Sequence, residues 1–238
     1  MSGWKAKRFW KAAEVVPLEG GYTVELDGRP MKTPAKAALH LPTRAMAEAV
    51  AAEWQAQEGE VKPNTMPVTR AANSAIDNVS RQHAEVAGFV AAYGDSDLTC
   101  YRADGPAELV ARQQEAWDPL LDWVEARYGV RLLPVAGVIH QPQPARAVEA
   151  LSAEVHAAGP FELTALHDLV ALSGSLVIGL AAFHDAREPE QLWHLSRIDE
   201  TWQAEQWGAD EEAQAVAALK QSDFLAAKRF LNLARASN

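Results

Sequence analysis

The stretch LVALSGSLVIGLAAF, from Leu169 to Phe183, says most about how this chain folds. It carries no charged residue, and His167-Asp168 and His184-Asp185 flank it. A membrane-spanning helix needs about 20 apolar residues, so this run is too short and instead predicts a helix buried in a protein core. We interpret Gly174 and Gly179 as places where neighbouring helices approach closely, not as a phosphate-binding loop.

Helical patterns dominate the chain around this run. Predicted helices cover residues 145–158, 161–184, 189–207 and 210–235, separated by Gly159-Pro160, Glu188-Pro189 and Gly208. Another begins at Pro106, and Asp118-Pro119 predicts a second start within it, which gives a kinked helix pair ending at Gly129. Residues 129–144 are expected to be extended, and one option is that they return to a sheet.

The first 63 residues have a different pattern. Tyr22, Val24 and Leu26 alternate along one face, and Asp27-Gly28 follows as a turn signal, so a β-hairpin is predicted. Thr43 is the expected N-cap of a helix that ends near Gly59, with its apolar side formed by Met46, Val50 and Trp54. We therefore predict an α+β protein, with a small mixed sheet-and-helix domain at 1–63 and a mainly helical domain at 64–238.

Composition argues against two kinds of partner. The 238 residues are 48% hydrophobic with a formal net charge of -10, which opposes sequence-independent binding to nucleic acid or to an anionic membrane surface. The shortness of the apolar run also predicts no stable membrane insertion. The exception is a basic start interleaved with aromatic residues, which we interpret as a solvated terminal strand in preference to a docking arm: Trp4, Lys5, Lys7, Arg8, Phe9, Trp10 and Lys11.

Sequence signals for catalysis, metals or cofactors are absent. The single cysteine, Cys100, lies in DLTCYRA without a neighbouring histidine, so we predict a buried small side chain and no disulfide. The chain has no glycine-rich phosphate loop, nucleophile elbow or His-Glu-x-x-His pair. We expect no enzyme activity, no cofactor and no metal.

A tryptophan-rich segment, WHLSRIDETWQAEQWG at 193–208, is the candidate site. At 100° per residue, Leu195, Ile198 and Trp202 form one apolar stripe that faces a core. A second row on the other side contains Trp193, Glu200 and Trp207, with Ser196 beside it. Two interpretations stay open: this row binds a partner, or the helix is central and Glu200 either lies at its solvent edge or pairs with an internal arginine.

Adjacent acids in this segment do not form a catalytic pair. Asp199 and Glu200 diverge by 100° on a helix, so their carboxylates do not face one site. Trp and Tyr supply most interface hot spots, and a carboxylate can pair with a partner's arginine. The predicted partner-binding residues are Glu200, Asp199, Trp193, Trp207 and Ser196.

Six blocks of the sequence, in order, resemble the assembly chaperones of the catalytic head of F-type ATP synthase, in particular the member that attends the alpha subunit in mitochondria and alphaproteobacteria. The blocks are RFWK (8–11), LDGRPMKTP (26–34), EWQAQ (53–57), DLTCYRA (97–103), QQEAWDPLLDW (113–123) and DETWQAEQWG (199–208).

The resemblance implies a chaperone that binds free alpha subunit until the beta subunit displaces it. It also implies that the acidic residue required in this family falls on Glu200. The start of the chain lacks the import leader of mitochondrial members, which suggests a bacterial cytoplasmic protein, and we expect a monomer when free. Two alternatives stay open: a homo-oligomeric scaffold, or a small-molecule enzyme with an acidic site around Glu200.

Overall fold

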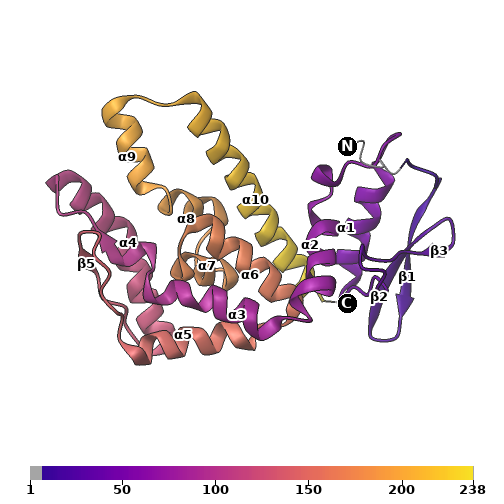
Figure 1. Ribbon diagram of the computed structural model, residues 1–238, viewed down its shortest axis with the longest axis horizontal. Helices are drawn as coiled ribbons and strands as arrows, with labels where there is room; N and C mark the ends of the chain where they lie inside the picture. Colours follow the sequence, from indigo (N-terminus) through magenta and orange to yellow (C-terminus); the bar gives the residue numbers. More distant parts are fainter. Residues whose placement is uncertain (1–6, 238) are drawn as a thin grey trace. The chain divides into compact units, whose positions relative to one another are not determined.

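The computed structural model describes residues 7–237, and Figure 1 shows the order of its elements. A short antiparallel sheet near the start is followed by a long series of helices. This confirms the predicted α+β class. Within the described residues, no helix is both long and apolar enough to span a bilayer.

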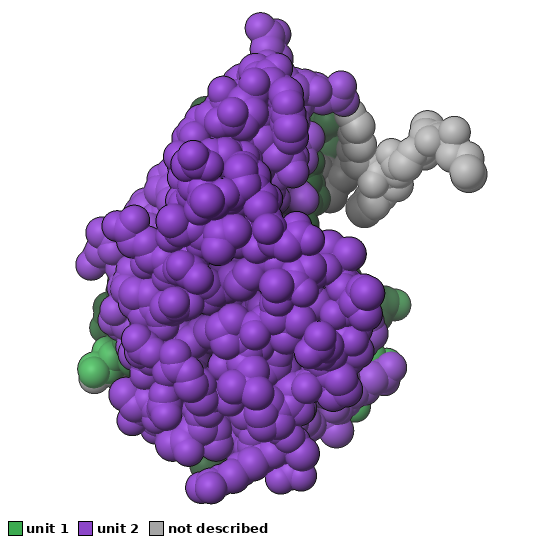
Figure 2. Space-filling model, turned by 90° about the vertical axis from the view of Figure 1, so that its left-hand side faces the viewer, with its two compact units in different colours: residues 1–83, 159–165, 229–238 green, residues 84–158, 166–228 purple. Residues whose placement is uncertain are grey.

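The chain divides into two compact units, coloured in Figure 2. Unit 1 contains residues 1–83, 159–165 and 229–238, and unit 2 contains residues 84–158 and 166–228. The sequence predicts a boundary between two domains at residue 63, and this boundary stays a prediction. Unit 1 itself continues to residue 83 and also takes in two later segments of the chain.

The sheet of unit 1 has the strand order β1-β2-β3, with β1 at Ala13–Leu18, β2 at Gly21–Leu26 and β3 at Arg29–Pro30. Both pairs are antiparallel. The predicted turn is confirmed, because Asp27 and Gly28 have φ of 49° and 77°, which asparagine, aspartate and glycine tolerate best. We did not predict β1, which contains Pro17 and lies at the sheet edge, where proline is tolerated.

Helix α1, Arg44–Gln55, packs on β1 and β2. Its N-cap is Thr43, as predicted, because the Thr43 hydroxyl accepts a hydrogen bond from the Met46 N–H at 3.1 Å. The helix ends four residues before the predicted Gly59. Trp54 from its last turn packs against the buried Trp10 at a ring-centroid distance of 5.0 Å, which joins the start of the chain to the helix.

The basic start of the chain is partly structural. The Arg8 guanidinium donates to four backbone carbonyls, those of Trp10, Lys11, Gln55 and Gln57, at 2.6–3.1 Å. Arg8 therefore holds this segment against the end of α1 and is not a free cation. Trp4 and Lys5, which belong to the same prediction, lie outside the described residues.

The rest of unit 1 before residue 83 is a run of short helices. It contains a 3-10 helix η1 at Pro63–Thr65, the α-helix α2 at Pro67–Ser74 and a π-helical turn η2 at Ala75–Val79. The Glu53 carboxylate from α1 accepts hydrogen bonds from the Val68 and Thr69 N–H groups, both at 2.8 Å. Glu53 thus caps the N-terminus of α2, where these N–H groups have no partner within the helix.

Unit 2 is helical. Its elements are α3 (His83–Ala91, whose first residue belongs to unit 1), η3 (Ala92–Asp95), η4 (Leu98–Cys100), α4 (Ala107–Tyr128), α5 (Ala145–Ala157), α7 (Leu176–Phe183), α8 (Pro189–Leu195) and α9 (Ile198–Trp207). Helices α6 (Pro160–Ser173) and α10 (Glu211–Arg235) each have residues in both units.

Three helix predictions need correction. The kinked pair is one continuous helix, α4, with Pro119 inside it. The helix expected over 161–184 breaks into α6 and α7 at Gly174, whose φ of 74° suits glycine, and the one expected over 189–207 breaks into α8 and α9 at Ser196 and Arg197. The periodic pattern of apolar residues does not reveal the breaks between α6 and α7 and between α8 and α9, because the pattern continues across both.

The start of α7 is stabilised from a distant part of the sequence. Ser175 caps the helix, and its hydroxyl donates to the buried Asp97 carboxylate at 2.7 Å, while the Val177 N–H donates to the same group at 2.9 Å. Thr99 donates to it through its N–H and hydroxyl. Burial raises the pKa of Asp97, and these hydrogen bonds oppose that shift.

All eight residues of α7 are buried, which confirms the core prediction for this part of the run. Gly179 also allows the predicted close approach. A Cβ at this position would collide with the Val170 side chain and lie 3.3 Å from the Val170 Cα, so only glycine lets α7 lie this close to α6.

The extended segment at 129–144 contains β5, Val135–Ala136, which pairs in parallel with β4, Tyr101–Arg102. These two strands form a second sheet that is separate from β1–β3. Gln143 secures the segment, because its side chain bonds the N–H and the carbonyl of Leu133 at 2.7 and 2.9 Å.

Candidate partner-binding surface

The break between α8 and α9 separates the predicted row of site residues. Trp193 in α8 is 3% exposed and packs against Phe224 of α10 at 5.7 Å between ring centroids. Ser196 is 1% exposed, and its hydroxyl donates to the Trp193 carbonyl at 2.7 Å. The prediction of one continuous row is therefore wrong, since 100° per residue applies only within an unbroken helix. Trp193 and Ser196 belong to the core.

Asp199, in the first turn of α9, faces α4. The Gln113 side-chain N–H donates to the Asp199 carboxylate at 2.6 Å, and the Gln113 side-chain oxygen accepts from the Ala103 N–H at 2.8 Å. Gln113 is buried, so both of these hydrogen bonds are shielded from water. Asp199 therefore serves mainly to attach α9 to α4.

A second attachment lies one turn and a half further along α9. Arg112 of α4 binds Glu205 with both terminal guanidinium nitrogens, Nη1 and Nη2, at 2.9 and 2.8 Å, and covers the Trp202 ring at 5.0 Å. The hydrogen bond from Arg112 lowers the pKa of Glu205. Trp202 was expected to face a core; it packs under a charged side chain at the surface, and α9 contains no buried residue.

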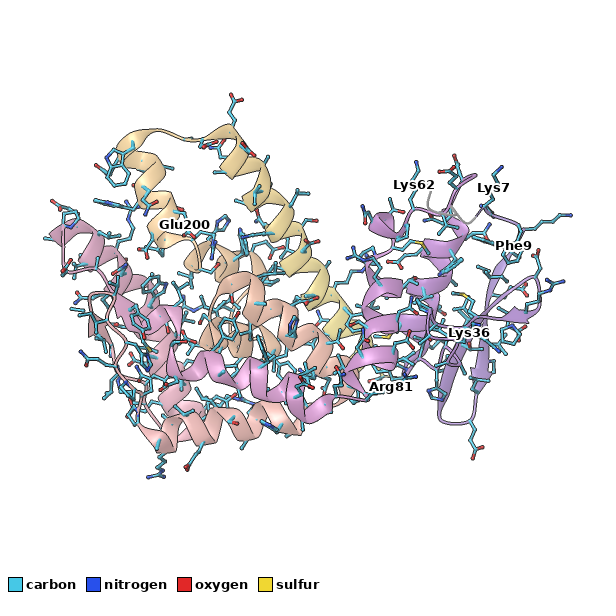
Figure 3. All side chains as sticks on the ribbon, in the orientation of Figure 1. Lys7, Phe9, Lys36, Lys62, Arg81 and Glu200 are labelled. Carbon is cyan, nitrogen blue, oxygen red and sulfur yellow. The ribbon has the colours of Figure 1, made fainter. Side chains whose placement is uncertain are left out.

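Glu200 forms the internal arginine pair that one interpretation expected, and its role in partner binding stays a prediction. It pairs with Arg197 at 2.9 Å, yet its side chain remains 57% exposed. Arg197 lies over the Trp193 ring at 5.1 Å and bonds the Ser196 hydroxyl at 3.2 Å, so the core below positions its guanidinium. Arg197 thus orients the Glu200 carboxylate, while more than half of the Glu200 side chain is exposed to solvent. Figure 3 labels the residue.

Beyond Glu200, the surface becomes acidic and aromatic. We call residues 198–223, which comprise α9, the connection and the first half of α10, the acidic hairpin. It contains seven Asp or Glu residues and a single lysine, Lys220, giving a net charge of -6. Three large apolar side chains on it face solvent: Trp207 (79% exposed), Leu219 (67%) and Val216 (47%). Exposed apolar side chains among charges are typical of a protein-binding surface.

Arg112, Gln113 and Arg197 are the site-supporting residues that the sequence analysis missed. The block QQEAWDPLLDW begins at Gln113 and Arg112 directly precedes it, but neither residue was given a role. The i,i+3 spacing of Arg197 and Glu200 is a charge pattern that could have revealed Arg197. No such pattern could reveal Arg112, because it lies 93 residues before Glu205. Only the packing of α4 against α9 brings the two together.

The remaining candidates for chemistry have structural roles. Cys100 is buried, and burial raises its pKa to about 12, which confirms the interpretation of a small core side chain. His184 pairs with Glu154 at 2.8 Å, and His167 pairs with Asp168 at 2.9 Å. Across residues 7–237, no three His, Cys, Asp or Glu side chains are grouped to hold a metal ion.

A family comparison places the chain among chaperones. Residues 7–125 match the family model described as "ATP12 chaperone protein". The chain therefore belongs to the ATP12 chaperone family.

Individual relatives agree with this assignment. The solved structure of Atp12 from Paracoccus denitrificans is 48% identical, with a TM-score of 0.95 over 98% of this chain and 100% of that chain. A point mutant of the same protein gives the same values. The mitochondrial protein atp12 of Schizosaccharomyces pombe is 24% identical over 222 residues, which is 88% of this chain and 76% of that protein.

Proposed function

We propose that this protein binds the free alpha subunit of F-type ATP synthase and prevents its aggregation until the beta subunit displaces it. As an ATP12 chaperone, the protein acts in ATP synthase assembly. The identity of the partner as the alpha subunit is proposed from the resemblance of the sequence to the family member that attends this subunit. In a bacterium, this role would place the protein in the cytoplasm.

The exposed carboxylate of Glu200 is the observation that carries the proposal. The residue that the family resemblance implies to be required is 57% exposed, on a helix with no buried residue. A residue needed only for folding would be expected in the core. Trp207 on the same helix adds an exposed aromatic anchor, which is the residue type that contributes most to protein interfaces.

The charge of the acidic hairpin supports a basic contact surface on the partner. Unpaired ring subunits expose large interfaces, and acidic charge on a chaperone keeps such a complex soluble and speeds encounter with basic residues. Release by competition requires that the chaperone bind alpha subunit more weakly than the beta subunit does. Affinity for alpha subunit should therefore be moderate and sensitive to salt.

Charge reversal tests this proposal. Glu200→Lys should weaken binding of purified alpha subunit at least tenfold, which corresponds to about 1.4 kcal/mol. Its melting temperature should change little, because exposed ion pairs contribute about 0–1 kcal/mol. The matched control is Glu149→Lys on α5 in the same unit, at a glutamate that is exposed and makes no ion pair within residues 7–237, and this variant should retain binding within twofold. Equal binding by the two variants would refute the role of Glu200.

Trp207→Ala tests the aromatic part of the surface. It should leave the free energy of unfolding within about 0.5 kcal/mol, as for most surface substitutions, and weaken alpha-subunit binding. Light scattering of the free protein at several concentrations belongs to the same experiment. Self-association that Trp207→Ala abolishes, together with unchanged alpha-subunit binding, would favour the scaffold alternative.

A further inference from the structure

A shallow depression lies in unit 1 on the α2 side. It is lined by one face of α2 and η2 and by the loop that follows β3, and its residues are Pro34, Ala35, Arg70, Asn73, Ser74, Asp77, Asn78 and Arg81. The sequence analysis gave no role to any of these residues. Arg81 and the neighbouring Lys36 are labelled in Figure 3.

Both arginines of this depression are free to bind a ligand. Arg70 and Arg81 are exposed, and across residues 7–237 neither guanidinium makes an ion pair or a hydrogen bond. Lys36, which directly follows the lining loop, is likewise exposed and unpaired within that range. Most other arginines of the protein are used in internal contacts, as Arg8, Arg112 and Arg197 show.

The one acidic residue that lines the depression, Asp77, binds the loop after β3 and not the arginines. The Asp77 carboxylate accepts hydrogen bonds from the Thr33 hydroxyl at 2.6 Å and from the Ala35 N–H at 3.0 Å. These bonds fix the loop that forms one wall of the depression. The Asp77 carboxylate keeps its charge, but within residues 7–237 it forms no ion pair with Arg70 or Arg81.

Unit 1 differs in charge from unit 2. Unit 1 has 13 Lys and Arg against 10 Asp and Glu, a net charge of +3. Unit 2 has 9 against 22, a net charge of -13, and the two values sum to the -10 of the whole chain. An acidic ligand is therefore attracted to unit 1 and repelled by unit 2.

The side chains in the depression suit a polypeptide. Guanidinium groups bind carboxylates with two parallel hydrogen bonds, and the Asn73 and Asn78 amides can both donate to and accept from a peptide backbone. Arg70 lies in α2, and Arg81 lies in the turn that follows η2, so the two guanidinium groups come from opposite ends of this lining. An extended chain advances ~3.3 Å per residue, so two of its carboxylates a few residues apart can pair with the two arginines.

We propose that the Arg70–Arg81 depression binds an extended acidic segment of the client protein, as a contact separate from the acidic hairpin. The identity of that client rests on the proposed function, but the binding chemistry does not. The protein would then offer its client two surfaces of opposite charge, one on each unit.

A labelled peptide of ten glutamates is the probe for this site, with binding followed by fluorescence anisotropy. The double variant Arg70→Glu/Arg81→Glu should lose at least tenfold in affinity for the peptide. The matched control, Lys32→Glu/Lys62→Glu, reverses two exposed lysines of the same unit and should stay within twofold of the unchanged protein. Circular dichroism checks folding, and Arg70→Gln/Arg81→Gln replaces the first variant if it unfolds.

Three results would overturn the proposal. One is an equal loss in both double variants, which would mean that only net charge matters. Another is complete displacement of the peptide by millimolar inorganic phosphate, which would indicate a site for a single anion. The third is tighter binding of a ten-nucleotide oligothymidylate than of the peptide.

Capture of purified alpha subunit separates this inference from the proposed function. Peptide binding without capture of alpha subunit would refute the proposed client and leave the depression as an acidic-peptide site. Capture that both Arg variants leave unchanged, with no peptide binding, would refute the depression alone.

Discussion

Helices α7 and α9 are both short helices of unit 2, with eight and ten residues, but they are held in place differently. Every residue of α7 is buried, and none of α9 is. α7 depends on apolar packing and on one buried carboxylate, whereas α9 depends on side-chain bonds to α4. A helix attached by polar bonds can leave its outer side free for a partner, and a helix inside the core cannot.

The strongest test of this contrast is at the base of α7. Asp97→Ala removes a buried acceptor that receives four hydrogen bonds, from Ser175, Val177 and twice from Thr99. We expect a loss of about 3 kcal/mol or more in the free energy of unfolding, because buried donors are left unsatisfied. Urea denaturation measures this loss. The control is Asp104→Ala, at an exposed aspartate without an ion pair in the described part of the chain. An equal change in both variants would contradict this account of α7.

A smaller effect is expected where α7 meets α6. Gly179→Ala places a methyl group against Val170, so we expect a loss of about 1–3 kcal/mol from overpacking. The comparison is Gly88→Ala in α3, where a Cβ meets nothing within 4 Å. That substitution should stabilise α3 slightly, because alanine has the higher helix propensity. If both variants lose the same stability, close packing at Gly179 is not the cause.

The attachment of α9 should be weaker than that of α7. Gln113→Ala removes the bonds to Asp199 and Ala103, and we expect a loss of about 1 kcal/mol. Hydrogen exchange should show faster opening of α9 amides and unchanged protection in α7. Equal acceleration in the two helices would show that they unfold together and that the contrast between them is wrong.

The smallest effect is a pH dependence at the far end of α9. The hydrogen bond from Arg112 lowers the pKa of Glu205. The ion pair therefore stabilises the attachment of α9 fully at pH values above the ordinary pKa of a glutamate. Its contribution is lost as the pH falls through the lowered pKa. The indole N–H signal of Trp202, observed by nuclear magnetic resonance, should shift over that range. In Glu205→Gln the shift should be absent, and its persistence would assign the titration to another group.

Several parts of the fold could be predicted from sequence because their causes are local. The Asp27-Gly28 turn and the Thr43 cap depend on residues next to each other. The burial of Leu176–Phe183 follows from a run of apolar residues without charge. The α+β class and the burial of Cys100 follow from patterns of the same kind.

The candidate site stays a prediction, and only part of its geometry follows from the sequence. Within the selected segment, 193–208, the structure shows Glu200 and Trp207 exposed. The two residues that belong to the core, Trp193 and Ser196, could not be distinguished, because a single helix was assumed. The supporting residues Arg112 and Gln113 were missed because they lie about ninety residues away from their partners.

The amino-acid sequence by itself determined which segments are apolar, where turns and caps occur, and how charge is distributed. Those properties act over a few residues, through backbone sterics and the spacing of side chains. Tertiary structure decided where helices break and which tryptophans are covered. The start of α7 is stabilised by Asp97, 78 residues before Ser175, and α9 by Arg112, 93 residues before Glu205. Such bonds form only once the helices have packed together, so no local pattern predicts them.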